Sequence, residues 1–341
     1  MISFVWPNIM TFTPWAGGSE VYTMNHLREL QRRGIATRII TCNKENAASL
    51  ASYPDVPTLA LSNDSELSEL DDTLIFVLHP MRITTKHQSY VILHNTVKGP
   101  QHDDSAIYAN NGLGDIQPIA TSHYMAQYFK DILHLPSKPP VIYPSADAAF
   151  SEVVRPESPD GPVRILFAGR PTQEKGVYTL LGSLYMQPIL KKSFIVDCIA
   201  TMNNNDTGEA DAIIALFKAH PRITTISPGK DRQEMAKIYA EHDIVIMPTS
   251  SLMWKEAFGM ISIEAQHAGC RVVASNDGGL PETDCGELIL VEPDNPLALA
   301  EGIAKAMELG PLTTAQRQQA VKRFTDAESL DSLLSLINAP I

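Results

Sequence analysis

Two cations stand close together in a glycine-flanked turn in the second half of the chain. Arg170 and Lys175 lie in the segment Gly-Arg-Pro-Thr-Gln-Glu-Lys-Gly at residues 169–176, directly after the apolar run 164–168. Ligands of parallel sheets bind where the strands end, and two cations around one turn can converge on one anion such as a diphosphate. A surface turn with two solvated cations is the alternative for this segment taken alone.

Two glutamates, Glu256 and Glu264, bracket a second segment. Gly259 is expected to begin a helix, and the first N–H groups of that helix, at Phe258, Gly259 and Met260, can hold phosphate oxygens. Carboxylates do not bind phosphate, so the glutamates need another task, and each can accept hydrogen bonds from paired hydroxyls of a sugar or a ribose. Because Glu264 falls inside the helix, an ion pair with a nearby cation is the alternative.

A third segment, Asn-Asp-Gly-Gly-Leu-Pro-Glu at residues 276–282, follows the apolar run 271–274. Its paired glycines, Gly278 and Gly279, can let the backbone approach a ligand closely. A plain strand-to-helix turn explains the same residues, and it is the preferred interpretation of this segment alone.

Short apolar runs alternate with longer helical patterns along the chain, which is typical of parallel sheets flanked by helices. In the first half the expected strands are residues 2–6, 36–41, 74–78, 90–93, 117–121 and 141–143. In the second half they are residues 164–168, 194–199, 223–226, 244–247, 271–274 and 288–291. Helical patterns cover residues 19–33, 177–190, 209–219, 232–241, 260–268 and 297–308. The chemically interesting segments therefore follow strands, at the edge where such sheets bind ligands.

A chain of 341 residues suits two domains better than one. Residues 147–162 contain three prolines, a glycine and several charges, and they are the best linker candidate. We therefore expect one domain at residues 1–150 and a second at residues 151–312. A helix within residues 313–341 is expected to be able to pack back onto the first domain.

The composition excludes several classes of function. The net charge is −12 at pH 7, whereas binding of nucleic acid needs a basic face. Neither half offers a basic platform for anionic lipid, so membrane contact is expected to be peripheral at most. The four cysteines show no paired spacing, the first residues resemble no signal peptide, and no apolar run is long enough to span a bilayer. These features favour a cytoplasmic protein, while the oligomeric state stays open.

The order of the three segments, G-R-x4-K-G, E-x7-E and G-G-x-x-E, resembles the retaining glycosyltransferases of family 4. The resemblance is dense from about residue 164 to residue 309 and thinner before it. It implies the GT-B fold, in which two doubly wound Rossmann-like α/β domains face each other across a cleft. It also implies an enzyme that moves a sugar, with retention, from a UDP- or GDP-sugar donor to a hydroxyl acceptor. Polysaccharide, glycolipid or small-metabolite glycoside synthesis would be the setting.

The resemblance assigns roles to the matching positions of the second half. Arg170 and Lys175 would contact the donor diphosphate and stabilise the leaving nucleotide. Glu256 would hold hydroxyls of the transferred sugar, and Glu264 would bind the ribose hydroxyls. The turn 258–260 would present its backbone to phosphate and sugar. The first three of these side chains are expected to take part in catalysis.

In the first half, Gly17 and Gly18 resemble the family's glycine-rich loop, which lies close to the diphosphate and the acceptor. His94 ends an apolar run and resembles the family's histidine near the reacting sugar, so it joins the expected catalytic group. The alternative for His94 is a structural histidine held by hydrogen bonds.

The chain departs from the family pattern in two places. Pro-Ser-Ala-Asp at residues 144–147 replaces a proline-asparagine-glycine-valine-aspartate run. Ala-Thr-Met-Asn at residues 200–203 replaces a glycine-rich turn that lies near the nucleotide. Lys230 sits where such enzymes hold the base, but no residue there selects one base over another. The identity of the donor is therefore open.

The sequence contains no D-x-D, no H-E-x-x-H and no cysteine cluster, so no metal cofactor is expected. The diphosphate charge then falls to Arg170, Lys175 and the N-terminus of the helix at Gly259. In the family's front-face mechanism the leaving phosphate oxygen takes the acceptor proton, which differs from the paired carboxylates of a glycosidase.

Other classes remain possible readings of the same motifs. A GT-B epimerase would act on a sugar nucleotide without an acceptor, and a phosphorylase would need a cofactor environment that the sequence does not display. A non-catalytic relative of a glycosyltransferase would bind a donor without turnover. An NAD-dependent enzyme is disfavoured, because the first loop lacks the G-x-G-x-x-G pattern.

Overall fold

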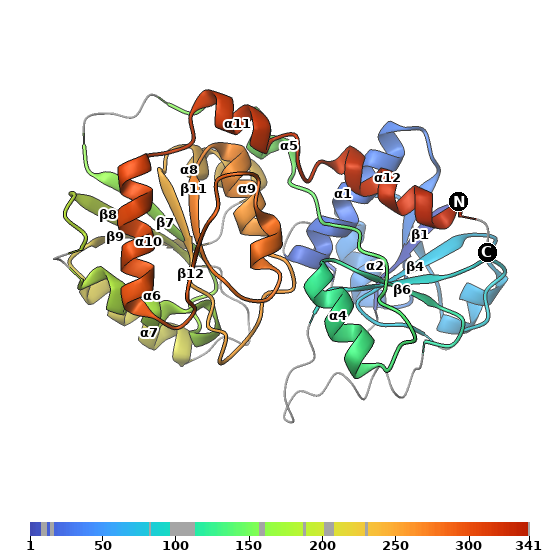
Figure 1. Ribbon diagram of the computed structural model, residues 1–341. Coiled ribbons are helices and arrows are strands. Elements are labelled where there is room, and N and C mark those ends of the chain that lie inside the picture. Colours follow the sequence, from blue (N-terminus) through green and yellow to red (C-terminus); the bar gives the residue numbers. More distant parts are fainter. Residues whose placement is uncertain are drawn as a thin grey trace. The chain divides into compact units, whose positions relative to one another are not determined.

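The computed structural model describes most of the chain, which divides into two compact units (Figure 1). One unit comprises Met1–Ser145 together with Asp326–Ile341, and the other comprises Ala146–Thr325. Each is an α/β unit built on a parallel sheet, so the predicted fold class of paired Rossmann-like domains is confirmed. The described residues are 1–7, 12–13, 17–81, 83–95, 113–156, 161–186, 189–200, 208–228 and 231–339.

The first unit contains a six-stranded parallel sheet with the order β3-β2-β1-β4-β5-β6. Strands β1 and β5 are buried along their whole length, because their apolar side chains face helices on both sides. The strand order reverses between β1 and β4, which is where sheets of this kind bind ligands. The strands are β1 (Ile2–Val5), β2 (Thr37–Thr41), β3 (Thr58–Ala60), β4 (Thr73–Val77), β5 (Tyr90–Leu93) and β6 (Gln117–Ala120).

The sheet differs from the expected strands in two places. Strand β3 was not expected, because it has only three residues at the edge of the sheet and its outer side chains are exposed. Residues 141–143 do not form a strand and make a single bridge, from Val141 to Ala120. Prolines at 139, 140 and 144 flank this segment and cannot donate to a ladder, so pairing ends there.

The helices of the first unit are α1 (Gly18–Arg32), α2 (Lys44–Leu50), α4 (His123–Ile132) and α12 (Asp326–Ile337), with a 3-10 turn η1 (Asp64–Glu69). Leu330 and Leu333 of α12 are fully buried in the same core as Leu27 and Leu30 of α1. The hydroxyl of Ser329 donates to the carbonyl of Tyr143 over 2.6 Å. The chain therefore returns to its first unit with α12.

The helix expected within residues 313–341 is two helices with different locations. Helix α11 (Thr314–Ala320) belongs to the second unit, and only α12 belongs to the first. Arg317 fixes α11, because its guanidinium donates to the carbonyls of His267 and Val153, each over 2.7 Å. Phe324, in the segment between the two helices, has a φ of +55°.

The second unit contains a six-stranded parallel sheet with the order β12-β11-β10-β7-β8-β9. Helices α6, α7 and α10 cover one face of it, and α5, α8 and α9 cover the other (Figure 1). The strands are β7 (Val163–Gly169), β8 (Phe194–Ala200), β9 (Ile223–Pro228), β10 (Ile244–Met247), β11 (Arg271–Ser275) and β12 (Ile289–Val291). The helices are α5 (Ala148–Glu152), α6 (Val177–Leu184), α7 (Glu209–Ala219), α8 (Arg232–Ala240), α9 (Met260–Ala268), α10 (Pro296–Leu309) and α11, with 3-10 turns η2 (Gln173–Lys175) and η3 (Leu280–Thr283).

The second unit begins at Ala146, ahead of the boundary expected at residue 150. Part of the expected linker is helix α5, which Asp147 caps by accepting from the N–H of Ala149 over 2.8 Å. Phe150 in this helix is fully buried. A short apolar helix after a capping aspartate therefore packs into the second core, where its composition had indicated a linker.

Candidate functional site

The turn after β7 lies against the end of β10 because of one glycine. Gly176 has φ +71°, and a Cβ there would lie 1.6 Å from the carbonyl oxygen of Pro248, which directly follows β10. Only glycine tolerates both the backbone conformation and this approach. The contact places Lys175 beside the segment that carries Glu256. The two neighbouring strands β7 and β10 thus bring together residues that are 81 positions apart.

Lys175 and Arg170 each pair with a carboxylate. The ammonium of Lys175 donates to Oε1 of Glu256, and the guanidinium of Arg170 donates to Oε1 of Glu174. The side chains of Lys175 and Arg170 remain 21% and 29% exposed, so an incoming anion can reach both cations. Neither is the fully solvated cation of the alternative reading. The partner Glu174 was missed from the sequence, although its spacing of four residues from Arg170 is typical of ion pairs on one turn.

Helix α9 begins where the sequence predicted. Gly259 is its N-cap residue, Met260 its first residue, and no side chain caps this end. The turn through Phe258 leads into the helix, whose N-terminus carries a partial positive charge. This end can therefore accept an anion next to Lys175 and Glu256.

Glu264 lies one turn into α9 and is 5% exposed. Nη1 of Arg232, the first residue of α8, donates to Oε1 of Glu264 over 2.7 Å. Burial raises the pKa of Glu264, and the charge of Arg232 opposes that rise. The ion pair that the sequence left as an alternative is therefore present. Arg232 was not found from the sequence, because no local spacing links residues on two separate helices.

The paired glycines after β11, Gly278 and Gly279, lie against the backbone of the segment that carries Glu256. The N–H of Gly279 donates to the carbonyl of Glu256 over 2.8 Å. A Cβ on Gly279 would lie 2.3 Å from the carbonyl oxygen of Ala257, and a Cβ on Gly278 would lie 2.6 Å from that of Glu256. The third segment thus supports the backbone of the second one, and this support positions the Glu256 side chain.

In the first unit, Gly17 is the N-cap residue of α1 and Gly18 its first residue. A Cβ on Gly17 would lie 2.8 Å from Oε2 of Glu20, a buried side chain in the first turn. Burial raises the pKa of Glu20. The N-terminus of α1 therefore has no side-chain cap, and the carboxyl group of Glu20 lies close to it.

His94 follows β5 directly and is 8% exposed. Burial lowers its pKa to about 3, so the imidazole is neutral at neutral pH. Its Nε2 atom is buried and has no hydrogen-bond partner among the described residues. The ring meets that of Tyr22 edge to face, with 5.1 Å between centroids.

Some of the residues singled out in the sequence lie outside the described part of the chain. These are Lys230 and residues 201–203, near which the base was expected. Within the described ranges, no group of three or more histidine, cysteine, aspartate or glutamate side chains is arranged to hold a metal ion. None of the described helices is long and apolar enough to cross a membrane.

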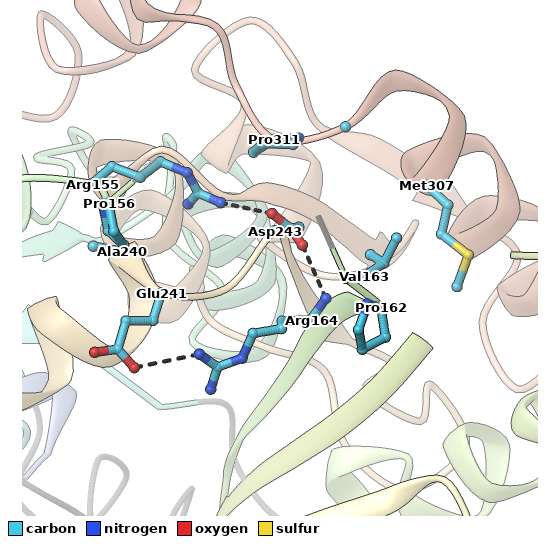
Figure 2. A pocket seen from close by; sticks show the side chains of 12 residues that line it. Arg155, Pro156, Pro162, Val163, Arg164, Ala240, Glu241, Asp243, Met307 and Pro311 are labelled. Carbon is cyan, nitrogen blue, oxygen red and sulfur yellow. Dashed lines mark hydrogen bonds and ion pairs between the residues drawn. The ribbon is translucent and has the colours of Figure 1, made fainter. Parts of the chain in front are cut away.

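A separate pocket of about 210 Å³ lies at the other edge of the second sheet, where β7 and β10 begin (Figure 2). Asp243 accepts from the guanidinium of Arg155 and from the N–H of Arg164, each over 2.9 Å. Arg164 also lies 3.5 Å from Glu241. These charges compensate one another, and the pocket is far along the strands from Lys175 and Glu256. It is therefore distinct from the candidate site.

The fold matches solved glycosyltransferases over nearly the whole chain. A glycosyltransferase from Rickettsia africae has a TM-score of 0.73 at 18% identity, with 98% of this chain and 97% of that chain covered. HepE of Anabaena, solved with UDP and glucose, has a TM-score of 0.71 at 14% identity, with 99% of each chain covered. At such identities the likeness concerns the fold alone, and that fold is the GT-B architecture of glycosyltransferases.

The family model described as glycosyl transferases group 1 matches residues 151–323, about half of the chain. The chain therefore belongs to the family of group 1 glycosyltransferases. Among curated relatives it is similar to the lipopolysaccharide 1,2-N-acetylglucosaminetransferase of Salmonella typhimurium, with 25% identity over 59% of this chain and 58% of the relative. It is also similar to the D-inositol 3-phosphate glycosyltransferase of Mycolicibacterium smegmatis, with 26% identity over 57% of this chain and 46% of the relative. The matches thus span about half the length of these relatives.

Proposed function

We propose that this protein transfers a sugar, with retention of configuration and without a metal ion, from a UDP- or GDP-sugar to a hydroxyl acceptor. The observation that carries the proposal is the Lys175–Glu256 pair, which lies beside the uncapped N-terminus of α9 at the carboxyl ends of β7 and β10. A cation, a carboxylate and a helix N-terminus in one place suit a ligand that joins a diphosphate to a hydroxyl-rich sugar.

Each charged residue has a task in this proposal. Phosphate oxygens replace Glu256 as the partner of Lys175 and replace Glu174 as the partner of Arg170. Each charge-assisted hydrogen bond to phosphate contributes about 1.5–3 kcal/mol. The released Glu256 accepts hydrogen bonds from hydroxyls of the transferred sugar. The second oxygen of Glu264 accepts from the ribose hydroxyls. The backbone of Phe258, Gly259 and Met260 faces phosphate and sugar.

In the bond-forming step, the acceptor hydroxyl attacks the anomeric carbon on the face from which the nucleotide leaves. The bond to the phosphate oxygen breaks, and that oxygen takes the acceptor proton. Arg170, Lys175 and the α9 N-terminus stabilise the negative charge that develops on the phosphate. In the first unit, the neutral His94 contacts the reacting sugar, and Gly17 and Gly18 lie near the diphosphate and the acceptor.

The names of the relatives indicate the chemical class of the acceptor and not its identity. They mention lipopolysaccharide and inositol phosphate, so we place the acceptor among polysaccharides, glycolipids or small metabolites. The UDP bound to HepE supports a nucleoside diphosphate as the leaving group. We place the protein in the cytoplasm, because its cysteines are free thiols, three of them buried, as a reducing compartment favours.

Lys175→Ala and Arg170→Ala test the proposal. Release of nucleoside diphosphate is measured with a panel of UDP- and GDP-sugars, and we expect kcat to fall by about two to three orders of magnitude in either variant. Lys218→Ala on the exposed side of α7 is the control and should match the wild-type rate. Full activity of Lys175→Ala would refute the assignment. An isomerised donor would indicate an epimerase, and tight binding without turnover would indicate a non-catalytic relative.

A further inference from the structure

Arg232 is a largely buried cation that forms an ion pair with Glu264. Its side chain is 17% exposed, and Nη1 donates to Oε1 of Glu264 over 2.7 Å. The guanidinium lies over the ring of Phe150, with 4.6 Å from Cζ to the ring centroid. Its Nε and Nη2 atoms are buried and have no hydrogen-bond partner among the described residues. Leaving two donors unpaired is costly, so the position of this arginine needs a reason beyond local stability.

Aromatic side chains and a helix cap surround Arg232. Phe150 is fully buried in α5 and stacks against Tyr239 of α8, with 5.5 Å between ring centroids. Asp231 caps α8 by accepting from the N–H of Glu234 over 2.8 Å. The guanidinium thus packs on an aromatic ring, and the helix that carries it is capped at its N-terminus. Its orientation toward α9 is set by packing.

The other groups around Glu264 disfavour the ionised form of its carboxyl group. Glu264 is buried, and Asp147 at the start of α5 adds a second negative charge nearby. Tyr239 is fully buried, its pKa lies well above the usual value, and it stays neutral. Among the charged groups of the described residues that act on Glu264, only Arg232 favours the carboxylate, and it donates to Oε1. None of the described residues hydrogen-bonds Oε2.

We propose that Arg232 is a positioning residue of the nucleotide subsite, which holds Glu264 ionised and directs its Oε2 atom to the ribose hydroxyls. This inference rests on the proposed function, because it assumes that Glu264 meets a ribose. An ionised carboxylate oxygen accepts from the 2′- or 3′-hydroxyl, whereas a protonated carboxyl loses much of that capacity. Recognition of the ribose therefore depends on a residue that need not touch the ligand.

The test compares binding of a nucleoside diphosphate with binding of its 2′-deoxy analogue. The probe is UDP or GDP, whichever the wild-type protein binds more tightly, and the readout is the ratio of the two Kd values from pH 6 to pH 8.5. Taking a ratio cancels the titration of the phosphate itself. We expect the wild-type ratio to be about tenfold at every pH, the value of one good hydrogen bond.

In Arg232→Met the ratio should approach one at pH 6 and rise with pH, because Glu264 without its cation is protonated over more of this range. Arg232→Lys should restore most of the wild-type ratio, since it keeps the charge. Glu264→Gln should show a low ratio that does not change with pH. Arg222→Met is the matched control, because Arg222 also lies over a phenylalanine ring, that of Phe194 at 4.8 Å. It should leave the ratio unchanged.

Several results would overturn the inference. If Arg232→Met shows the same Kd ratio as the wild-type protein at every pH, Arg232 does not position Glu264. That result would leave the proposed function in place. A wild-type protein that binds neither UDP nor GDP would refute both. If Arg232→Met does not fold, Arg232→Gln takes its place. The wild-type ratio is itself a test, because a decline between pH 8.5 and pH 6 would show that Arg232 does not keep Glu264 ionised.

Discussion

Three cations near the carboxyl edge of the second sheet, Lys175, Arg170 and Arg232, each pair with a glutamate. The pairs offset the cost of gathering like charges at one sheet edge. Lys175 and Arg170 keep partial exposure, so phosphate oxygens can replace their carboxylates. The guanidinium of Arg232, whose side chain is 17% exposed, also packs on the ring of Phe150. In the proposed function, phosphate replaces the carboxylate in the first two ion pairs, while the Arg232–Glu264 pair stays in place.

Two buried histidines of the first unit, His94 and His26, should make that unit less stable in acid. Burial lowers the pKa of His94 to about 3 and that of His26 to about 4, from an ordinary value of 6.5. The unfolded chain takes up these protons below about pH 6.5 and the folded chain does not, so the free energy of unfolding falls as pH drops through that window. Between pH 7.5 and pH 4.5, we expect His94 to account for about 2–3 kcal/mol of the loss.

Urea unfolding of His94→Gln at these two pH values checks this prediction. The variant should lose less stability on acidification than the wild-type protein. His87→Gln is the control, because the side chain of His87 is 49% exposed. A variant at His94 with the wild-type pH dependence would contradict the buried, neutral state of this imidazole.

At the scale of elements, the loops after β7, β10 and β11 form one interlocked group. Gly176 lets the first loop contact the end of β10, and Gly279 lets the third loop contact the backbone of Ala257. The second loop, which carries Glu256, is therefore held from both sides. Its side chain is positioned by close contacts of backbone with backbone, which a methyl group would disrupt.

Gly279→Ala should move the Glu256 loop. The new Cβ would lie 2.3 Å from the carbonyl oxygen of Ala257, so one of the two backbones must shift. We expect a loss of about 1–3 kcal/mol in stability and a rise of at least tenfold in the donor KM. Gly286→Ala is the control. Gly286 has φ +119° and nothing within 4 Å of its Cβ position, so this change adds backbone strain without a clash. Equal effects of the two changes on KM would contradict a specific role of the contact.

The elements that carry these loops were predictable from local patterns. Strand β10 and helices α7 and α9 begin and end where their apolar periodicity and flanking residues indicated. The motifs on their ends therefore fell on the correct edge of the sheet. Elements with weak local signals were not predictable, such as the short exposed strand β3. The same is true of the α5 helix, whose capping aspartate and buried phenylalanine lie in a segment that is polar on average.

Contacts between elements could not be predicted from the sequence either. Glu256 and Glu264 could be found by their spacing within one segment. Their partners Lys175 and Arg232 lie on other elements, and only the packing of the sheet and of α8 against α9 joins them. Lys175 could be predicted because it lies in a motif of its own, whereas Arg232 belongs to no motif. Residues that act through a neighbour on another helix leave no local pattern.

At the scale of the whole molecule, the chain passes between its two units twice, after Ser145 and after Thr325. The last helix, α12, therefore supplies part of the first unit's core. Leu330 and Leu333 are fully buried there, and Ser329 joins the helix to the carbonyl of Tyr143. The first unit is thus built from two separate stretches of sequence, while the second unit is continuous in sequence.

Leu330→Ala should destabilise the first unit selectively. Truncating a fully buried leucine costs about 2–5 kcal/mol, and the loss should stay within the cooperative unit that contains the cavity. Hydrogen exchange measured by mass spectrometry resolves the two units, because peptides from β1 and β4 report on the first, and peptides from β7 and β10 on the second. We expect protection to fall in the first set and to persist in the second. Leu309→Ala, at a side chain that is 53% exposed in the second unit, should change neither set. An equal loss of protection in both sets would show instead that the two units unfold as one.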